Sequence, residues 1–483
     1  MQKINDSVCI TLKQNSLIVA NTGKSFERKG VLSICYSNLS SKDKKTQIHL
    51  ENYADCKDNE FIEGIHKRQI NKYREDRNDL EEHSKNEIEK RRDYTGRYLL
   101  ELLQNADDAM GDSQYSLGEI GSKGIGFKSI LEISEEPEIF SGDFHFKFSA
   151  QLTQTKLKEI YKDPPKLTFR VPHLCNKDAE IESFLKDFTT VIRFTLTDEA
   201  TEKVSNELQS FDQRSLLFVQ NIKHLKINHF GSESIYEVKG SRTPLDATVL
   251  TLSVTKDQQL EKERWKRWST IWVNKKEPQR KQSIAIVLPI DEKNNVQPTR
   301  EYENLYVYFK TKVKLFCKAL IHASFDPSSD RNHVRDRDED PEIDNEILDE
   351  LQKKISDIIL TIPPEIAIQS FNLSQYNDLS EEEMNLDLEQ KIYHQLYLVI
   401  KNTPFIPVVG NKKKCIEEVS SLDSSIVELL KTETKHVQDL YLLDPKLKNY
   451  FSVFSDNGIK DFSKPGDALI FCQNNTYKDC FKV

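Results

Sequence analysis

The sequence predicts an α+β protein that contains more than one domain. Its 483 residues exceed the size of an ordinary single domain. Strand-rich segments such as 8–20 and 190–196 stand between amphipathic helical segments such as 94–110. Apolar residues make up 37% of the chain and charged residues 30%, a balance that favours folded cores with a charged surface.

The first half of the chain is expected to alternate strands with helices. Residues 8–20 predict two strands joined at Gln14 and Asn15, which is a hairpin. A helix rich in Glu, Lys and Arg is expected from about Glu60 onward. Residues 94–110 predict an amphipathic helix, because Leu99, Leu102, Leu103 and Ala106 recur at helical spacing. Further strands are expected at 166–171, 190–196 and 222–227.

A second unit is expected from about residue 235. A long helix over 344–360 is predicted to end at the Pro363–Pro364 pair. The charged run 328–342 predicts a surface loop, and residues 375–483 are expected to mix short helices with loops. The strands of this unit are expected at 248–254, 282–288, 305–309 and 314–322.

Composition excludes several classes of protein. No apolar run approaches the roughly 20 residues that span a bilayer, and the N-terminus does not resemble a secretory signal. The eight cysteines and eleven histidines show no metal-ligand spacing, which predicts reduced thiols and a cytoplasmic protein without a zinc site. A net charge of −9 argues against a broadly basic nucleic-acid surface.

The segment 96–129 is the strongest clue to function. Glycine supports tight turns and close approach to a ligand, so the motif around Gly121, Gly124 and Gly126 favours backbone contacts to phosphate, aided by Lys123 and Lys128. The alternative is an ordinary surface helix followed by a flexible loop. This segment contains six of the chain's fifteen glycines, namely Gly96, Gly111, Gly118, Gly121, Gly124 and Gly126.

Glu101 and Asn105 favour the nucleotide interpretation over that alternative. They stand four residues apart on one predicted helix, so both side chains leave the same face. A carboxylate there can orient and deprotonate water, and a neighbouring amide oxygen can ligate Mg²⁺.

These motifs carry a family resemblance. ELLQNADDA at 101–109 resembles the N-box of GHKL ATPases, and IGSKGIGFKSIL at 120–131 resembles their second glycine box. GIGFKS, followed by EPEIFSG at 136–142, is most similar to the sacsin/No Vein branch. The resemblance implies a two-layer α/β sandwich ATPase domain that binds ATP and Mg²⁺.

The family also has a first glycine box that contacts adenine, and here it is expected at the N-terminus. LIVANTGKSFERKGVLSICYSNLSSK at 17–42 resembles this box, whereas the family places it between the N-box and the second glycine box. Moving residues 1 to about 46 into the gap near Ser113 restores the family order, so we interpret the nucleotide domain as circularly permuted. The alternative is that Asn21 to Gly23 is only the exit turn of a hairpin.

The resemblance implies a role for each matching residue. Glu101 would be the general base, Asn105 the Mg²⁺ ligand, and Asp108 a support of the adenine pocket. Asn21 stands where the family usually has an aspartate that accepts from the adenine amino group, and Gly23 would let the base approach the backbone. Residues expected near the phosphates are Ser40, Ser41, Lys42, Gly121, Lys123, Gly124, Ile125, Gly126, Phe127, Lys128 and, for the γ-phosphate, Arg331, with Lys310 and Lys312 as further candidates.

The resemblance also implies a domain plan. Residues 1–230 would form the ATP-binding domain, with the first glycine box at 17–42, the N-box at 97–110 and the second glycine box at 118–131. Residues 231–365 would form a transducer-like α/β domain, followed by a mostly helical C-terminal region at 366–483.

The leading functional hypothesis is a Mg²⁺-dependent ATPase that acts as a conformational switch in a chaperone-like or defence role. The resemblance implies a homodimer through the ATPase domain and a protein client. One alternative is a nucleotide-sensing scaffold without turnover. Another is a nucleic-acid-processing ATPase, because Trp265, Trp268 and Trp272 lie among basic residues at helical spacing; a core-facing stripe explains the same pattern.

Overall fold

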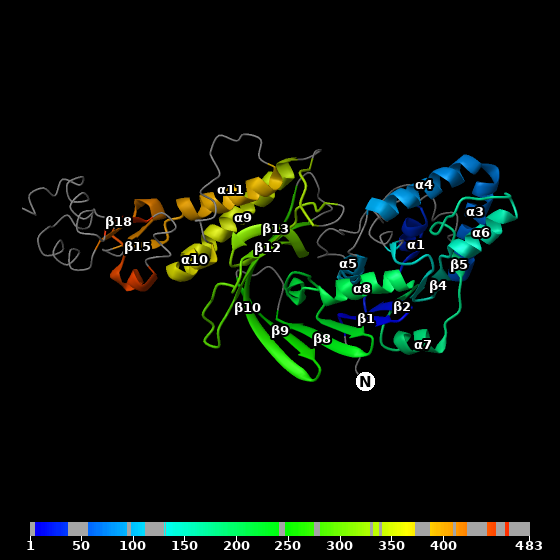
Figure 1. Cartoon of the computed structure of the whole chain (residues 1–483), viewed down its shortest axis with the longest axis horizontal. Coiled ribbons are helices and arrows are strands. Elements are labelled where there is room, and N and C mark those ends of the chain that lie inside the picture. The colour runs from blue at the N-terminus through cyan, green and yellow to red at the C-terminus, as the bar shows by residue number, and fades with distance from the viewer. Residues whose placement is uncertain are drawn as a thin grey trace, which may run out of the picture.

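A large mixed β-sheet runs through most of the molecule (Figure 1). The computed structural model describes residues 5–36, 57–93, 98–111, 130, 132–240, 247–274, 281–328, 332–337, 341–371, 387–408, 412–422, 442–450 and 459–462. Within these residues the main sheet has 14 strands in the order β13-β12-β14-β11-β10-β9-β8-β7-β1-β2-β6-β3-β4-β5. The β1–β7 and β12–β14 pairs are parallel, and the other pairs are antiparallel.

The strands of the main sheet are short in the first half and longer in the second. They are β1 Ser7–Lys13, β2 Ser16–Asn21, β3 Pro137–Ser141, β4 Phe144–Lys147, β5 His173–Leu174, β6 Thr190–Thr195, β7 His224–His229, β8 Ser232–Lys239, β9 Thr248–Lys256, β10 Gln259–Val273, β11 Lys281–Pro289, β12 Glu303–Val307, β13 Phe309–Cys317 and β14 Leu320–Ala323. The expected hairpin at 8–20 is confirmed, since β1 and β2 pair from Val8↔Asn21 to Lys13↔Ser16.

Helices accompany both halves of the sheet. In the first half they are α1 Arg28–Cys35, α3 Asp58–Glu75, α4 Arg77–Asp93, α5 Tyr98–Met110, α6 Ala150–Lys158, α7 Ala179–Leu185, α8 Asp198–Gln209 and the 3₁₀ helix η2 Gln213–Leu217. In the second half they are α9 Pro341–Thr361, α10 Pro364–Ser370 and α11 Leu388–Asn402, with short 3₁₀ turns η3 Ile416–Glu418 and η5 Pro445–Tyr450. None of the helices in the described ranges is both long and apolar enough to cross a bilayer.

Alternation along the strands builds two cores in the first half. Successive residues of a strand point to opposite faces of the sheet. Ile10 and the residue paired with it, Val19, point to one face, where they join apolar residues of α1, α3, α5 and α8 in the main core. Cys9 and Ala20 point to the opposite face and pack with Ile181 of α7 in a smaller cluster. The first half is therefore a sheet with helices on both faces.

The long helix expected at 344–360 is confirmed as α9 Pro341–Thr361, and α10 begins at Pro364. The prediction that 328–342 is a surface loop is wrong in part, because Val334 and Arg337 are buried and α9 begins at Pro341. Arg337 donates to the carbonyl oxygen of Ser324 and to Asp326, which ties this loop to the end of β14.

Two further sequence-based expectations are wrong. Residues 166–171 do not form a strand, because the amides of Thr168 and Phe169 donate to the Glu87 carboxylate of α4 at 2.8 and 3.0 Å instead of to a neighbouring strand. The tryptophan segment is not a helix but β10. In a strand, Trp265 and Trp268 face opposite sides, and both are buried because the sheet is covered on both faces there.

The predicted division near residue 230 falls at the turn of the β7–β8 hairpin, inside the continuous sheet. Beyond residue 366 the described part contains α11 and two small sheets, β15 Ile406–Val408 with β16 Lys412–Lys414, and β17 Ser420–Leu422 with β18 Lys460–Phe462. The expectation of a mostly helical C-terminal region is not confirmed there. The coarse α/β character that the sequence predicts is present.

Candidate functional site

A row of polar side chains crosses the end of three neighbouring strands. Asn21 of β2 lies opposite Thr190 of β6, and Thr190 lies opposite Ser141 of β3. The three residues are 8%, 4% and 0% exposed, and the hydroxyl oxygens of Ser141 and Thr190 lie only 2.5 Å apart. We call Asn21, Thr190 and Ser141 the polar row.

The polar row lies on the same face of the sheet as helix α5. Asn21 follows Leu17 and Val19 at the two-residue spacing of a strand, and both of these residues belong to the main core that α5 completes. Thr190 follows the same spacing with Ile192. A buried polar row on an otherwise apolar face needs partners, because unpaired polar groups are costly away from water.

The turn after β2 is seated on the C-terminal end of α5. The side-chain oxygen of Asn21 accepts from the Gly23 amide at 3.0 Å, which closes the turn on itself. The Lys24 amide donates to the carbonyl oxygen of Ala109 at 2.8 Å, and its ammonium group donates to the carbonyl oxygen of Gly111 at 3.0 Å. Such donors satisfy carbonyl groups that the end of a helix leaves without partners.

Position 23 requires a glycine because the turn after β2 comes very close to helix α5. Its φ lies outside the left-handed region, but a Cβ at this position would stand 2.8 Å from both the carbonyl carbon and the Cβ of Ala109. Only glycine allows the turn to reach the helix so closely. Residues 17–42 and 97–110, which are distant in the chain, are therefore in contact at Gly23 and Ala109.

Helix α5 places the two predicted catalytic-site residues along the same side as this turn. Glu101, Asn105 and Ala109 follow one another at four-residue spacing, so each is rotated by only about 40° from the one before it. Glu101 is 5% exposed, and Asn105 is partly exposed. The helix thus carries a buried carboxylate in its first turn and a partly exposed amide near its middle, and Gly23 packs against its last turn.

The two aspartates of the N-box differ in environment. The Asp107 carboxylate accepts from three successive amides, those of Gln220, Asn221 and Ile222, at 3.0, 2.7 and 2.8 Å. Asp107 is 6% exposed, whereas Asp108 is only partly buried. The sequence singled out Asp108 for the adenine pocket, and the structure adds Asp107 as the residue that anchors α5.

Acidic groups surround the start of α5. Tyr98, the first residue of the helix, is 2% exposed. Burial raises the pKa of its phenol above the usual range, and the charges of Glu207 and Glu132 raise it further. Lys203 of α8 lies 3.4 Å from the Glu132 carboxylate and offsets part of this negative charge. Tyr98 therefore stays neutral at physiological pH.

Several predicted site residues lie outside the described residues. They are Ser40, Ser41 and Lys42 of the first glycine box, Gly121, Lys123, Gly124, Ile125, Gly126, Phe127 and Lys128 of the second, and Arg331. The structure brings together Asn21, Gly23 and the helix that carries Glu101, Asn105 and Asp108.

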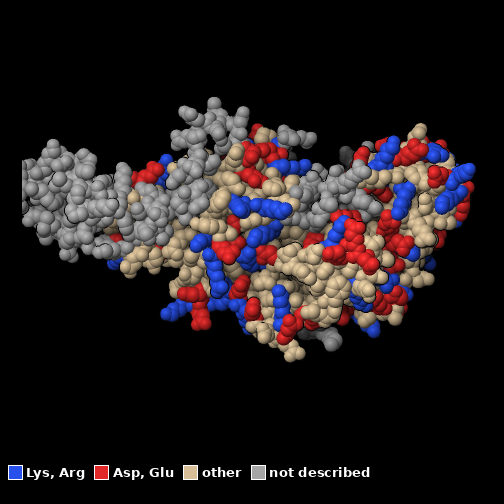
Figure 2. Space-filling model, in the orientation of Figure 1, with Lys and Arg blue, Asp and Glu red and all other residues tan. Residues whose placement is uncertain are grey.

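The other candidates for a phosphate-sensing cation lie on β13. Figure 2 shows Lys and Arg side chains gathered over the region of β12 and β13. Lys310 lies 3.7 Å from Asp212 and 4.0 Å from Glu303, so it belongs to an ionic network. Lys312 is exposed on this edge strand, where lysines commonly discourage pairing with other sheets.

Sequence reasoning missed Thr190, Ser141 and Asp107 as site residues. Ser141 lies in EPEIFSG, which carries the family resemblance, and Thr190 begins the segment 190–196, which is expected only as a strand. The alignment of Thr190 and Ser141 with Asn21 depends on the pairing register of three strands that are distant in sequence. The sequence shows a hydroxyl residue at the end of a predicted strand, but it does not show which residues of other strands lie beside it.

Comparisons with known proteins give a short match. No family model matches the chain. A segment of 31 residues is 64% identical to Protein NO VEIN of Arabidopsis thaliana, and the match covers 6% of this chain and 1% of NO VEIN. This suggests a distant link to the No Vein/sacsin branch.

Proposed function

We propose that the protein binds MgATP and hydrolyses it, acting as a conformational switch of the GHKL type. One observation carries the proposal: the Asn21–Gly23 turn is seated on the end of the helix that bears Glu101 and Asn105. The motifs of the first glycine box and the N-box stand apart in the chain, yet they meet in the fold. The order of these elements supports a circularly permuted nucleotide domain.

The residues present fit a nucleotide and Mg²⁺ in chemical type. A buried carboxylate at Glu101 can accept a proton from a water molecule, and Asn105 supplies an oxygen suited to Mg²⁺. The polar row supplies hydroxyl and amide groups that can hydrogen-bond a purine base. Bound MgATP would supply the phosphoanhydride bond that is hydrolysed. Asn105 would hold the Mg²⁺ ion, and the second glycine box would hold the negatively charged phosphates.

The deciding experiment separates binding from turnover. We expect Glu101→Gln to bind MgATP with near wild-type affinity while phosphate release falls by about 10²-fold or more, because the amide cannot accept the proton. Glu138→Gln is the matched control, since Glu138 pairs with Arg193 at 2.6 Å on the opposite face of the sheet. If wild type binds MgATP without turnover, the scaffold alternative replaces the ATPase.

The nucleic-acid alternative gains no support from the tryptophan segment. Trp265 and Trp268 are 5% and 6% exposed, so neither ring can stack on a base. A homodimer through the ATPase domain, a protein client, a chaperone-like or defence role and a cytoplasmic location remain parts of the proposal. Size measurements with and without a non-hydrolysable ATP analogue would test the dimer.

A further inference from the structure

The segment 212–222, which we call the strap, connects α8 to β7 and touches two distant parts of the fold. We propose that the strap couples the position of helix α5 to strands β12 and β13, with Asp107 as the positioning residue on the helix. The proposal rests on the proposed function in one respect, because it gives the coupling a role in controlling Glu101 and Asn105. The coupling itself can be measured without nucleotide.

One end of the strap is fixed to α5 by charge-assisted hydrogen bonds. The amides of Gln220, Asn221 and Ile222 donate to the Asp107 carboxylate, and the side-chain amide of Asn221 donates to the Asp107 carbonyl oxygen at 2.8 Å. Hydrogen bonds to an ionised group are stronger than neutral ones and hold a fixed geometry. A displacement of the strap therefore pulls on the turn of α5 just beyond Asn105.

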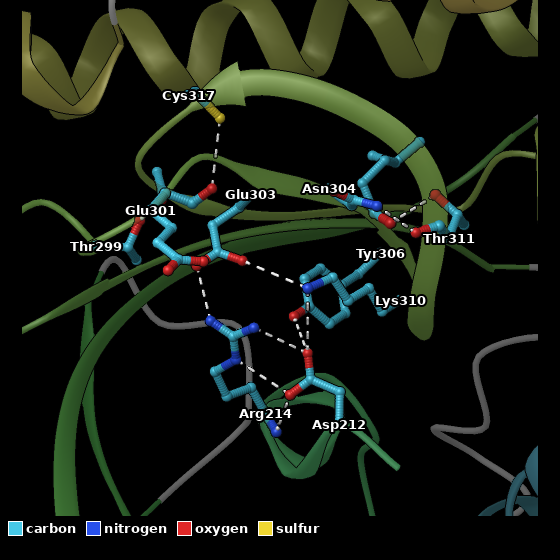
Figure 3. A network of polar contacts seen from close by, with 12 residues as sticks. Asp212, Arg214, Thr299, Glu301, Glu303, Asn304, Tyr306, Lys310, Thr311 and Cys317 are labelled. Atoms are coloured by element: carbon cyan, nitrogen blue, oxygen red, sulfur yellow. Dashed lines mark hydrogen bonds and ion pairs between the residues drawn. The ribbon is translucent and has the colours of Figure 1, made fainter. Parts of the chain in front are cut away.

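The other end of the strap is fixed to β12 and β13 (Figure 3). Arg214 donates to Asp212 within the strap, at 3.0 Å from Nη2, and to Glu303 of β12 at 2.7 Å from Nη1. The Tyr306 hydroxyl donates to Asp212 at 2.7 Å, and Lys310 of β13 approaches the same carboxylate. Breaking this network would leave a buried charge without its partner.

The electrostatics of this end favour a single arrangement. Burial opposes ionisation of Asp212, but the hydrogen bonds and charge of Arg214 and the Tyr306 hydroxyl hold its pKa below the usual range. Burial raises the pKa of Glu303, whose side chain is 4% exposed and depends on Arg214 for compensation. Arg214 is thus held between two carboxylates, one on the strap and one on β12.

The middle of the strap is packed against the same strands. Phe218 is 1% exposed, and its ring centroid lies 4.8 Å from that of Tyr306 and 5.6 Å from that of His322 on β14. Close-packed interiors transmit displacement because they have few voids to absorb it. Polar anchors at both ends and a packed ring between them make the strap a connection between α5 and the second half of the sheet.

The test removes one hydroxyl at the far end and observes the helix. Tyr306→Phe deletes the donor to Asp212 and keeps the ring that packs on Phe218. In hydrogen exchange without nucleotide, we expect protection of the α5 amides and of amides 218–222 to fall by about fivefold to tenfold. The α3 and α7 amides should change less than about twofold in the same variant.

Tyr161→Phe is the matched control. The Tyr161 hydroxyl donates to the Tyr73 carbonyl oxygen at 2.7 Å, so the same atom is lost in a part of the molecule that the strap does not touch. Unchanged protection in α5 of Tyr306→Phe would overturn the proposal, as would an equal loss in α3, α5 and α7.

A second measurement links the strap to the proposed function. Asp107→Asn and Tyr306→Phe, made singly and together, should each weaken MgATP binding, with a combined effect that departs from additivity by about threefold or more. Additive effects would overturn the coupling while leaving the nucleotide site intact. Absence of MgATP binding in wild type would instead overturn the proposed function, and the exchange result would still decide the coupling.

Discussion

Gly23 and Ala109 are in direct contact although they lie far apart in the chain. A Cβ at Gly23 would stand 2.8 Å from the Cβ of Ala109, and the next amide, that of Lys24, donates to the Ala109 carbonyl oxygen. The contact joins the end of β2 to the end of α5. In the proposed nucleotide site, this contact places the turn after β2 against the helix that carries Glu101 and Asn105.

We expect Gly23→Ala to weaken both the fold and the site. The added methyl group cannot be accommodated by a flexible side chain, because the nearest atoms belong to the helix backbone and to Ala109 Cβ. Overpacking of this kind costs about 1–3 kcal/mol. Urea unfolding should show the loss of stability, and calorimetric titration should show MgATP affinity reduced by at least about tenfold, since the turn must move off the helix.

Gly30→Ala is the control for that prediction. Gly30 lies within α1, and a Cβ there would meet the Phe26 ring at 3.5 Å, an ordinary contact. Replacing a helical glycine by alanine stabilises a protein by about 0.4–1 kcal/mol. A Gly23→Ala variant as stable as Gly30→Ala would show that the turn does not press on Ala109.

The polar row predicts an effect of removing one hydroxyl. Thr190→Val keeps the shape of the side chain but removes the hydroxyl that lies 2.5 Å from Ser141 Oγ, which then keeps only the Phe26 amide as a donor, at a cost of about 1 kcal/mol. We expect MgATP affinity to fall as well, by about threefold to tenfold, because the hydroxyl lies beside Asn21. Thr153→Val is the control, since Thr153 is fully buried and its hydroxyl contacts His173 instead. Equal affinity in the two variants would exclude the polar row from the site.

Local patterns predicted the parts of the site that depend on neighbours in sequence. The period of two in 8–20 and the leucine spacing in 94–110 indicated β1, β2 and α5, because each burial pattern is repeated within a few residues. The proximity of Asn21 to the helix followed only from the family resemblance. Nothing in the local pattern of either segment encodes the contact between Gly23 and Ala109.

Long-range pairing decided the rest. Tryptophans spaced three and four residues apart suit one face of a helix. The segment is instead a strand covered on both faces, so successive residues such as Arg267 and Trp268 are both buried and the alternation of apolar and polar residues is lost. Residues 166–171 have strand composition, but the Glu87 carboxylate on α4 satisfies their amides. In both places a partner distant in sequence overrides the local signal.

Buried histidines predict a loss of stability in acid. Burial, together with the charge of Arg267, lowers the pKa of His322 to about 3, so its imidazole stays neutral while the same group in the unfolded chain gains a proton below about pH 6.5. The unfolded state then binds more protons, so stability falls as pH falls. Between about pH 6 and 4 we expect about 1.4 kcal/mol per pH unit from this residue, measured by urea unfolding.

Substitution separates His322 from the other buried imidazole. Burial, with the nearby charge of His66, lowers the pKa of His173 to about 4, so this residue contributes over a similar range. We expect His322→Gln and His173→Gln each to reduce the pH slope by about one proton, and the double variant to reduce it by about two. A wild-type slope in His322→Gln would mean that this imidazole is protonated in the native protein.

The tryptophan segment predicts a stability effect without an effect on nucleic-acid binding. Trp268 is 6% exposed and lies opposite Ile286 on β11, so Trp268→Ala should cost about 3–5 kcal/mol in urea unfolding. Lys262→Ala, at an exposed position of the same strand, should stay within about 0.5 kcal/mol of wild type. Neither change should alter anisotropy of a labelled single-stranded oligonucleotide at low salt, because the ring is inaccessible to bases and a single exposed lysine contributes little without it. The opposite result would be salt-dependent oligonucleotide binding by the wild type that is lost in a folded Trp268→Phe variant. That result would contradict the prediction, because it would require the buried ring to stack on a base.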